Sequence, residues 1–579
     1  MATAAVLLVC ALAGCAAIPV SGPVVAGAPV EADRGLRALV QGPSRGQDPV
    51  GIVRGFLRAV LGAGQDYEVA RTFLDPVAAA RWLPSDHTIV YAGEPTVRIV
   101  GEGGEEVPGG EVGEAVSVAA QIDMAVVGTL DAHGRYVQEP AGTRRLVDVR
   151  LSRDNPQGQW RISSLNNLSM VSASDFEFLY RDGYRLYFLD PTREFLVPEQ
   201  RWFPQSEATA TRLVAELLEG PSSWLAPAVV TAFPGSTELA PPSAVSTRAG
   251  QATVPLTPQA RNASGPERSL MQAQLLATLQ PVLGIGSVRM TVDSSELTVP
   301  AAASRPRADP DVQASPVLVA GERLVRLESR ELVDVKGLPD TSGLGISNPG
   351  MGYSDNGVYA VLAAERSQLR TVTQGADAVS EPLLTAPDLT APSFDWRGWV
   401  WTSPAVSTGT VFAARADSAA IEVTASWLEG RRVTSLRVSR DGTRAAVVST
   451  GADGSALIDL AGVDRSSDGT PTRLTVARTP VAGPDLLSAQ EAVWVDENSL
   501  AVLGRRVEDE RARVLLVEVG GTVQAPLTPV DGALVAITAG NGERSVLVAT
   551  DDGRLLGQAG AAWVEIPTDE GVRDPAFEG

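Results

Sequence analysis

The sequence predicts a multi-domain chain of mixed α+β and all-β structure. Three observations indicate this fold class. Short apolar helices are followed by strictly alternating strands, a middle segment has the order β-α-β-β-α-β, and the last part repeats β-rich runs with Asp-Gly or Asn-Gly turns at a period of roughly 40–50 residues. We therefore expect an α+β domain, an α/β sandwich and a C-terminal β-propeller of about six blades. A sandwich or a parallel β-helix is the alternative for the last part.

The chain opens with an apolar run that ends in "LAGC", formed by Leu12, Ala13, Gly14 and Cys15. A run from Ala2 to Ala13 is too short to span a bilayer and has the length of a signal-peptide core. The four residues match the bacterial lipobox, in which the cysteine thiol receives a diacylglycerol and the peptide is cut before it. No Lys or Arg precedes the run, which departs from usual secretory signals. The alternative is a plain secretory peptide in which Cys15 has no role.

Lipidation of Cys15 would leave the mature chain without a disulfide, because Cys10 is discarded with the signal. Two acyl chains suffice for stable anchoring. The formal net charge of −21 argues against nucleic acid as a partner and against a surface lying flat on anionic lipid. We expect a protein anchored by lipid to the outer face of the cytoplasmic membrane.

Composition shifts divide the chain into six predicted segments. They are a signal peptide (1–14), a lipidated tether (15–47), a domain of the nuclear-transport-factor-2-like kind (NTF2-like, 48–172), an α/β sandwich (180–300), a linker (301–315) and the propeller (316–579). The linker is rich in Pro and Ala, which suggests a hinge.

In the first domain, Asp48 and Pro49 form a helix start. In "VSVAAQIDMAV", six alternate residues share one strand face: Val116, Val118, Ala120, Ile122, Met124 and Val126. Helices followed by such strands predict a cone-shaped α+β fold.

In the second domain, Ser206 is predicted to cap a helix that Gly220 and Pro221 end. "YRLYFLD", "AVVTAF", "QATVPL" and "SVRMTV" are predicted strands, and "ERSLMQAQLLATLQP" is a second helix.

In the last domain, three tryptophans lie in "DWRGWVW": Trp396, Trp399 and Trp401. They could stack on a glycan, but Trp399 and Trp401 share one strand face, which favours packing between blades. The turns "SRDG" and "TDDG" could hold calcium, but type I′ hairpins explain them without a metal.

The order of these motifs resembles the actinobacterial LpqB lipoproteins. The lipobox, "DPVGIVRGFL", "DYEVARTFL", "ATRLVAELLEGP", "PSFDWRGWVWT" and "DPAFEG" carry the resemblance, which covers nearly the whole chain. "TRLVAELLEGP…TAFPGST" resembles the GerMN domain of sporulation and germination proteins. The resemblance implies a non-catalytic envelope lipoprotein that contacts the extracytoplasmic domain of the sensor kinase MtrB. It implies a role in modulating MtrA–MtrB two-component signalling in cell-wall homeostasis and division.

Catalytic chemistry is not indicated. "GPSRG", with Ser44 at its centre, satisfies G-x-S-x-G but lies in the tether without the strand and helix that a nucleophile elbow needs. The only histidines, His87 and His133, fit a strand edge and a turn. We predict no catalytic residues, no cofactor and no metal site.

Two functional classes remain. The first is an interaction protein that binds another envelope protein, and the second is a binder of peptidoglycan or another cell-wall glycan. A hydrolase on a propeller scaffold is a weaker third possibility, since carboxylate pairs need not be close in sequence.

Overall fold

A computed structural model describes residues 41–579, apart from 66, 102–104, 108–111, 141, 181–182, 243, 283, 302–303, 354–355, 407–408, 417, 477–485, 508, 522–526, 561 and 569. The signal peptide, the lipobox, Cys15 and most of the tether lie outside these residues. In the described part of the chain, no helix is both long and apolar enough to cross a membrane.

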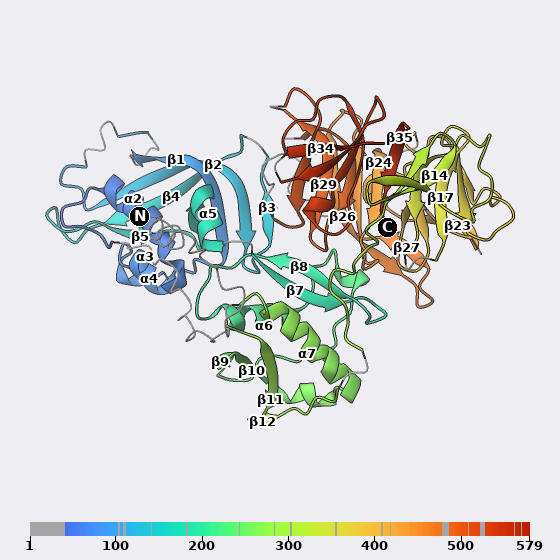
Figure 1. Cartoon of the computed structure of the whole chain (residues 1–579). Coiled ribbons are helices and arrows are strands. Elements are labelled where there is room, and N and C mark those ends of the chain that lie inside the picture. Colours follow the sequence, from blue (N-terminus) through green and yellow to red (C-terminus); the bar gives the residue numbers. More distant parts are fainter. Residues whose placement is uncertain are drawn as a thin grey trace, which may run out of the picture. The chain divides into compact units, whose positions relative to one another are not determined.

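The first unit packs short helices against a curved sheet that is antiparallel except for the parallel pair of β1 and β6 (Figure 1). The sheet has the order β5-β4-β2-β1-β6, and β3 pairs with β2. Its elements are α2 (Pro49–Ala59), α3 (Glu68–Arg71), α4 (Pro76–Arg81), β1 (His87–Val100), β2 (Ser117–Asp131), β3 (Tyr136–Gln138), β4 (Arg144–Ser152), β5 (Arg161–Ser164), β6 (Ser169–Ser172) and α5 (Ala173–Tyr180).

Local sequence explains these elements. Asp48 caps α2 by accepting a hydrogen bond from the Gly51 amide at 2.6 Å. Along β2 the alternation holds at Ala120, Ile122, Met124 and Val126, which are buried in the core. Val116 lies before the strand and is 48% exposed.

The second unit combines a four-stranded sheet, two helices and a separate two-stranded ribbon, β7–β8. The sheet order is β12-β11-β10-β9, and β10 and β11 are parallel. Its elements are β7 (Tyr184–Leu189), β8 (Leu196–Arg201), α6 (Thr209–Glu219), η3 (Ala226–Ala228), β9 (Ser246–Arg248), β10 (Gln251–Leu256), α7 (Gly265–Leu279), β11 (Ser287–Val292) and β12 (Ser295–Glu296).

Two predictions for this unit are wrong. The α6 helix begins at Thr209, its N-cap is Ala208, and Ser206 instead donates its backbone N–H to the Thr209 hydroxyl. "AVVTAF" is not a strand, because only Val230 forms an isolated bridge, with Leu189. The sequence pattern also missed β8, whose residues are buried throughout and so show no alternation.

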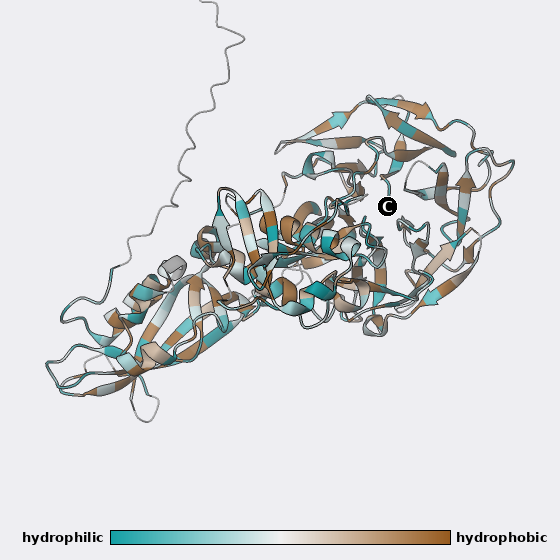
Figure 2. Ribbon diagram, turned by 90° about the horizontal axis from the view of Figure 1, so that it is seen from below, coloured by the Kyte–Doolittle hydropathy of each residue, from teal (hydrophilic) through white to brown (hydrophobic). Residues whose placement is uncertain are grey.

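The third unit is a β-propeller with six sheets in the described residues, and Figure 2 shows them arranged around a central axis. Five blades have four strands, and blade 5 has three in the part that the structure describes. The first blade is closed by the end of the chain, because β35 (Val572–Ala576) pairs with β13 (Val317–Ala320).

The remaining propeller strands follow in chain order. They are β14 (Arg323–Glu328), β15 (Glu331–Asp334), β16 (Ser347–Met351), β17 (Val358–Ala363), β18 (Gln368–Thr373), β19 (Leu384–Thr385), β20 (Ser393–Phe394), β21 (Val400–Thr402), β22 (Val411–Arg415), β23 (Ser418–Val423), β24 (Arg432–Val438), β25 (Arg444–Thr450), β26 (Ala456–Arg465), β27 (Pro471–Leu474), β28 (Leu486–Trp494), β29 (Ser499–Arg506), β30 (Arg513–Glu518), β31 (Leu534–Thr538), β32 (Leu547–Thr550), β33 (Leu555–Ala559) and β34 (Ala562–Ile566).

The turn prediction for "SRDG" and "TDDG" is also corrected. A type I′ turn needs two residues with positive φ. In these two turns only the glycines have it, Gly442 at +74° and Gly553 at +84°. Each of these turns therefore has one residue with positive φ, its glycine, and is not of type I′.

Candidate interaction site around the propeller channel

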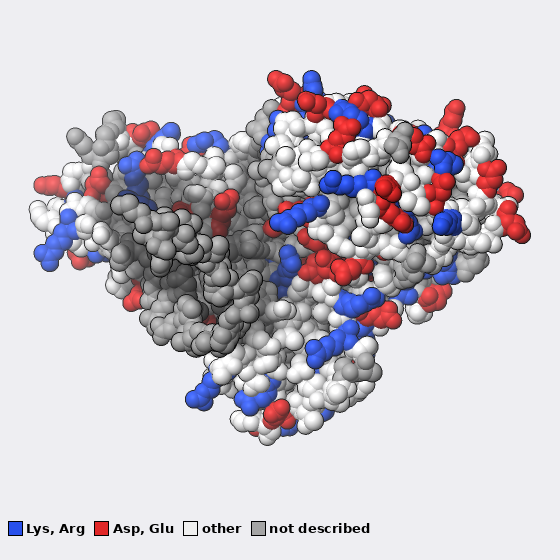
Figure 3. Space-filling model, viewed as in Figure 1, with Lys and Arg blue, Asp and Glu red and all other residues white. Residues whose placement is uncertain are grey.

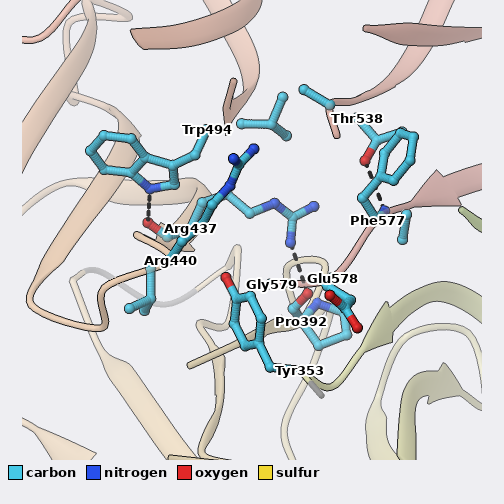
Figure 4. A pocket seen from close by; sticks show the side chains of 13 residues that line it. Tyr353, Pro392, Arg437, Arg440, Trp494, Thr538, Phe577, Glu578 and Gly579 are labelled. Carbon is cyan, nitrogen blue, oxygen red and sulfur yellow. Dashed lines mark hydrogen bonds between the residues drawn. The ribbon is translucent and has the colours of Figure 1, made fainter. Parts of the chain in front are cut away.

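The innermost strand of each blade lines the propeller channel, and in blade 1 this strand is β35. A small cavity lies near one end of the channel (Figure 4). The cavity is lined by Tyr353, Pro392, Arg437, Val438, Arg440, Val493, Trp494, Thr538, Ala539, Ala576, Phe577, Glu578 and Gly579. Its volume of about 40 Å³ holds a few water molecules. A small-molecule site normally needs several hundred Å³, on the order of 300–1,000 Å³. This cavity is therefore too small for a sugar ring.

The Arg437 guanidinium lines the cavity and is bonded to two other segments of the chain. It donates to the Glu491 carboxylate at 2.6 Å and to the carbonyls of Pro392 and Ala391 at 2.8 and 3.2 Å. Glu491 also accepts from the Ile537 amide at 3.2 Å. These bonds join blades 3, 4, 5 and 6 at the axis, so this charge pair serves the ring itself.

Arg440 lies closer to the cavity and is 5% exposed. It donates to the backbone carbonyls of Val495, at 2.9 Å, and Gly540, and it contacts the Asp309 carboxylate at 3.3 Å. Burial raises the pKa of Asp309 to about 6, although Arg440 opposes this and the nearby Glu497 and Asp496 add to it. Asp309 precedes the propeller, so the contact joins the channel to the preceding segment.

Residues 307–313, which we call the strap, are held at several points. The Arg307 guanidinium lies 4.8 Å from the Phe195 ring centre and 4.9 Å from that of Trp396. Its carbonyl accepts from the Leu196 amide at 2.8 Å, and Val312 exchanges two hydrogen bonds with the Asn541 side chain. The backbone of the strap is thus bonded both to the second unit, at Leu196, and to the propeller, at Asn541, whereas the hinge suggested for residues 301–315 stays a prediction.

The β7–β8 ribbon packs directly on propeller turns. The Tyr187 hydroxyl donates to Glu497 at 2.5 Å, and Arg185 donates to the same oxygen at 3.1 Å. Trp202 donates its indole N–H to the Gly520 carbonyl at 2.7 Å. One apolar core includes residues of this unit, such as Leu213, and of blades 4 and 5, such as Leu500. The second unit and the propeller thus share a buried interface.

A buried ion pair of the propeller, Arg444 with Asp441, lies beside the β7–β8 ribbon. Arg444 and Asp441 are 0% and 4% exposed, and the guanidinium contacts the carboxylate at 2.5 Å. Burial alone would raise the pKa of Asp441, but Arg444 and hydrogen bonds from Thr443 and Ser439 outweigh it and lower that pKa. Arg444 also donates to the Pro198 carbonyl at 3.4 Å. The "SRDG" turn thus helps to hold the neighbouring ribbon.

The candidate residues from the sequence are dispersed. Ser44 is exposed near the start of the described chain, and its amide donates a hydrogen bond to the Gln47 side chain at 2.9 Å. His87 begins β1, and burial lowers its pKa. His133 lies in a turn, as predicted, and contacts Glu216 of α6 at 3.0 Å.

The tryptophan prediction is confirmed for blade packing. Trp399 and Trp401 are 4% and 0% exposed and share a core with residues of blade 4. Trp396 is half-buried and packs between Phe195 and Tyr353, at 5.1 and 4.8 Å between ring centres. In the described residues, no group of three or more His, Cys, Asp and Glu side chains is arranged to hold a metal ion.

Sequence reasoning missed Arg307, Arg437 and Arg440. Arg307 and Arg440 lie in polar segments between strands, Arg437 lies in strand β24 among buried apolar residues, and "SRDG" was interpreted only as a turn. The one available signal was that this turn carries two arginines, Arg440 and Arg444, around its aspartate. Asp309, which Arg440 contacts, and Pro198, which Arg444 contacts, both lie more than 100 residues away along the chain. The local sequence therefore does not reveal these partners.

Fold and site together define a multi-domain protein with a β-propeller, in which hydrogen-bonded arginine side chains line the cavity in the channel. Family models match three segments: "Lipoprotein LpqB, N-terminal domain" at 42–177, "Sporulation and spore germination" at 185–298 and "Lipoprotein LpqB beta-propeller domain" at 322–578. The chain is similar to the lipoprotein LpqB of Thermobifida fusca, with 29% identity over 91% of this chain and 89% of the relative. It is similar to that of Streptomyces coelicolor, with 28% identity over 94% and 91%.

A solved structure of TolB from Acinetobacter baumannii also aligns, with 17% identity, a TM-score of 0.31, and coverage of 45% of this chain and 65% of that one. Assignment rests on the sequence comparisons, which extend through all three folded units. The chain belongs to the LpqB lipoprotein family.

Proposed function

We propose that this protein is a lipid-anchored, non-catalytic accessory of the cell envelope. It binds the extracytoplasmic domain of the sensor kinase MtrB and modulates MtrA–MtrB signalling in cell-wall homeostasis and division. The observation that supports this proposal is membership of the LpqB family through the N-terminal, germination-type and propeller segments. Lipidation at Cys15 would place the protein at the outer face of the membrane where such a domain is exposed.

The site geometry is compatible with a binding role. The channel is occupied by paired arginines and carboxylates, and its cavity of about 40 Å³ is small. Among the exposed large hydrophobic side chains in the described residues, Phe178 alone is aromatic. A broad aromatic platform for stacking sugars is therefore not part of the described surface, which favours a protein partner over a glycan.

The test is a binding measurement with the purified, lipidated full chain in nanodiscs. One arm measures affinity for the immobilised MtrB ectodomain, and the other measures co-sedimentation with purified cell wall from the same host. We expect saturable binding in the first arm only. Retention by cell wall alone would refute the kinase partner and support the glycan-binding alternative.

A further inference from the structure

Trp202 lies where the three folded units meet. It follows β8 of the second unit and is 3% exposed. Its indole N–H donates to the Gly520 carbonyl of the propeller at 2.7 Å, in a buried hydrogen bond. Its peptide N–H donates to the Gly134 carbonyl of the first unit at 2.8 Å. One residue of the second unit is therefore bonded to both of the other units.

On the side of the first unit, the Trp202 ring belongs to that unit's apolar core. Its centre lies 5.1 Å from that of Phe176 in α5 and 6.3 Å from that of Tyr136 in β3. A Cβ at Gly134 would lie 2.7 Å from the Trp202 carbonyl oxygen, so the two backbones approach too closely for a side chain. Aromatic packing and this backbone contact together fix the tryptophan against the first unit.

On the side of the propeller, the Trp202 ring lies against a turn of blade 5. A Cβ at Gly521 would lie 3.2 Å from the ring atom Cζ2. In the same turn, the Val519 amide donates to the Asn498 carbonyl at 2.7 Å. Asn498 lies in the turn between β28 and β29, at the end of the channel where the cavity lies. The tryptophan is therefore bonded to a turn that is itself bonded to the channel end of blade 5.

The β2–β3 hairpin of the first unit also contacts α6 of the second unit. Arg212 donates to the Ala132 carbonyl, and His133 contacts Glu216 at 3.0 Å. These bonds hold two units together, whereas the Trp202 contacts extend from the first unit to the propeller.

We propose that Trp202 is a joint that couples the first unit to the propeller, so that displacing one unit loosens the other. The physical basis is that one rigid side chain carries both contacts. If the first unit moves and draws the ring with it, the indole N–H leaves the Gly520 carbonyl. The reverse holds as well, because a coupling free energy between two sites is reciprocal.

This coupling acts wherever a partner binds. Over the visible surface of the propeller, Lys and Arg side chains are interspersed with Asp and Glu (Figure 3), so charge does not single out one docking face there. A partner that displaces the first unit would act on the propeller through the joint, and a partner on the propeller would act on the first unit. The joint is independent of the identity of that partner.

The first experiment measures hydrogen exchange in the full lipidated chain in nanodiscs. Gly134→Ala perturbs the first-unit side, because the new Cβ meets the Trp202 carbonyl and the Phe203 ring while the indole N–H is unchanged. We expect exchange to rise by about 5-fold or more in residues 132–136 and also in residues 519–521. Trp202→Phe keeps an aromatic ring but removes the donor, and it should loosen the same two segments. This variant keeps the test decisive if the alanine variant does not fold.

The matched control is Trp224→Phe, because the buried indole N–H of Trp224 in the second unit has no hydrogen-bond partner in the described part of the chain. Its exchange in both segments should stay within about 2-fold of the wild type. A wild-type exchange rate at residues 519–521 in folded Gly134→Ala would overturn the coupling. A wild-type rate at residues 132–136 in Trp202→Phe, or an equal rise in the control, would overturn it too.

A second experiment measures how tightly the first unit and the propeller are held. Spin labels replace Leu146 in the first unit and Val564 in the propeller, which are 62% and 47% exposed. A released joint lets units rotate as rigid bodies, so we expect a distance distribution about 2-fold wider in Trp202→Phe than in the wild type. Trp224→Phe should keep the wild-type width. Equal widths for Trp202→Phe and the wild type would overturn the joint.

Discussion

At the residue scale, arginine side chains in the propeller channel each bond several acceptors at once, which a lysine ammonium could not do in the same geometry. The chain has a single lysine, Lys336. Arg437 bonds one carboxylate and two carbonyls at once, and Arg440 bonds two carbonyls and two side chains. A guanidinium has five donors in a rigid plane, whereas an ammonium has three around one point. One arginine can therefore tie several blades together where backbone carbonyls converge at the axis.

Asp309 provides a prediction about pH. Its pKa is about 6 in the folded chain and near 4 when unfolded, so the folded state takes up the proton first as pH falls. Its contribution to stability is therefore present below pH 4 and is lost as pH rises through 6. We expect Asp309→Asn to reduce the gain in unfolding free energy between pH 7 and pH 5, measured by urea denaturation. The exposed Asp388→Asn serves as control. An unaltered pH dependence in Asp309→Asn would contradict the assignment.

Cys15 provides a prediction about anchoring. Replacing its thiol removes the acceptor for the diacylglycerol, and without two acyl chains stable membrane attachment is lost. We expect Cys15→Ser to abolish metabolic labelling with a radioactive fatty acid and to move the protein out of the washed membrane fraction. Cys10→Ser is the matched control and should label like the wild type. Labelling that persists in Cys15→Ser would show that the lipobox assignment is wrong.

At the element scale, the contact between η3 and β26 shows how a short segment is fixed. Gly462 lies in β26 beside η3, and its amide bonds to the Thr475 hydroxyl, which donates to the Trp224 carbonyl at 2.5 Å. A Cβ at Gly462 would lie 2.8 Å from that carbonyl oxygen and 3.0 Å from the Ala228 Cβ. Position 462 therefore needs glycine because the second unit and the propeller approach closely there. A special backbone conformation is not the reason, since Gly462 has no positive φ.

This contact yields a prediction about packing. Gly462→Val should lower the unfolding free energy by about 1–3 kcal/mol, because an overpacked site forces backbone movement. Gly571→Ala is the control, since nothing lies within 4 Å of its Cβ position. Urea denaturation gives the magnitude, and hydrogen exchange should rise in residues 226–228 of the valine variant only. Similar denaturation midpoints for the two variants would contradict the packing argument.

At the scale of the whole molecule, the second unit and the propeller share one core and a set of buried polar contacts. Glu497 is the centre of this set, because one of its oxygens accepts from both Tyr187 and Arg185. Burial of the Tyr187 phenol and the neighbouring negative charge of Glu497 raise the pKa of Tyr187. The phenol therefore stays protonated and donates the hydrogen bond. This geometry predicts that the two units unfold together.

A double-mutant cycle of Tyr187→Phe and Glu497→Gln tests this coupling. A buried hydrogen bond to a charged group contributes about 1.5–3 kcal/mol, and we expect a coupling energy in that range from urea denaturation at pH 7. The exposed pair Arg473 and Asp464, 2.7 Å apart, is the comparison and should give about 0–1 kcal/mol. A coupling near zero for Tyr187 and Glu497 would contradict the shared interface.

Much of the local structure was predictable because it depends on neighbouring residues. Asp48 and Asp75 cap helices as their sequence context indicates, and the alternation along β2 places its apolar residues in the core. The predictions failed where distant contacts replace the local signal. "AVVTAF" lacks a strand partner along most of its length, and β8 is buried on both faces by segments remote in sequence.

The sequence alone predicted the fold class, a propeller of about six blades and the resemblance to LpqB lipoproteins, and it predicts the lipid anchor at Cys15. These features depend on periodicity and short motifs, which a chain carries wherever it folds. Only the tertiary structure shows that Arg437 and Arg440 line one cavity in the propeller channel and that Arg307 lies against Phe195 and Trp396. Those residues come from segments that are brought together only when the propeller closes through β35 and β13. A local sequence pattern does not predict which distant side chains will share a site.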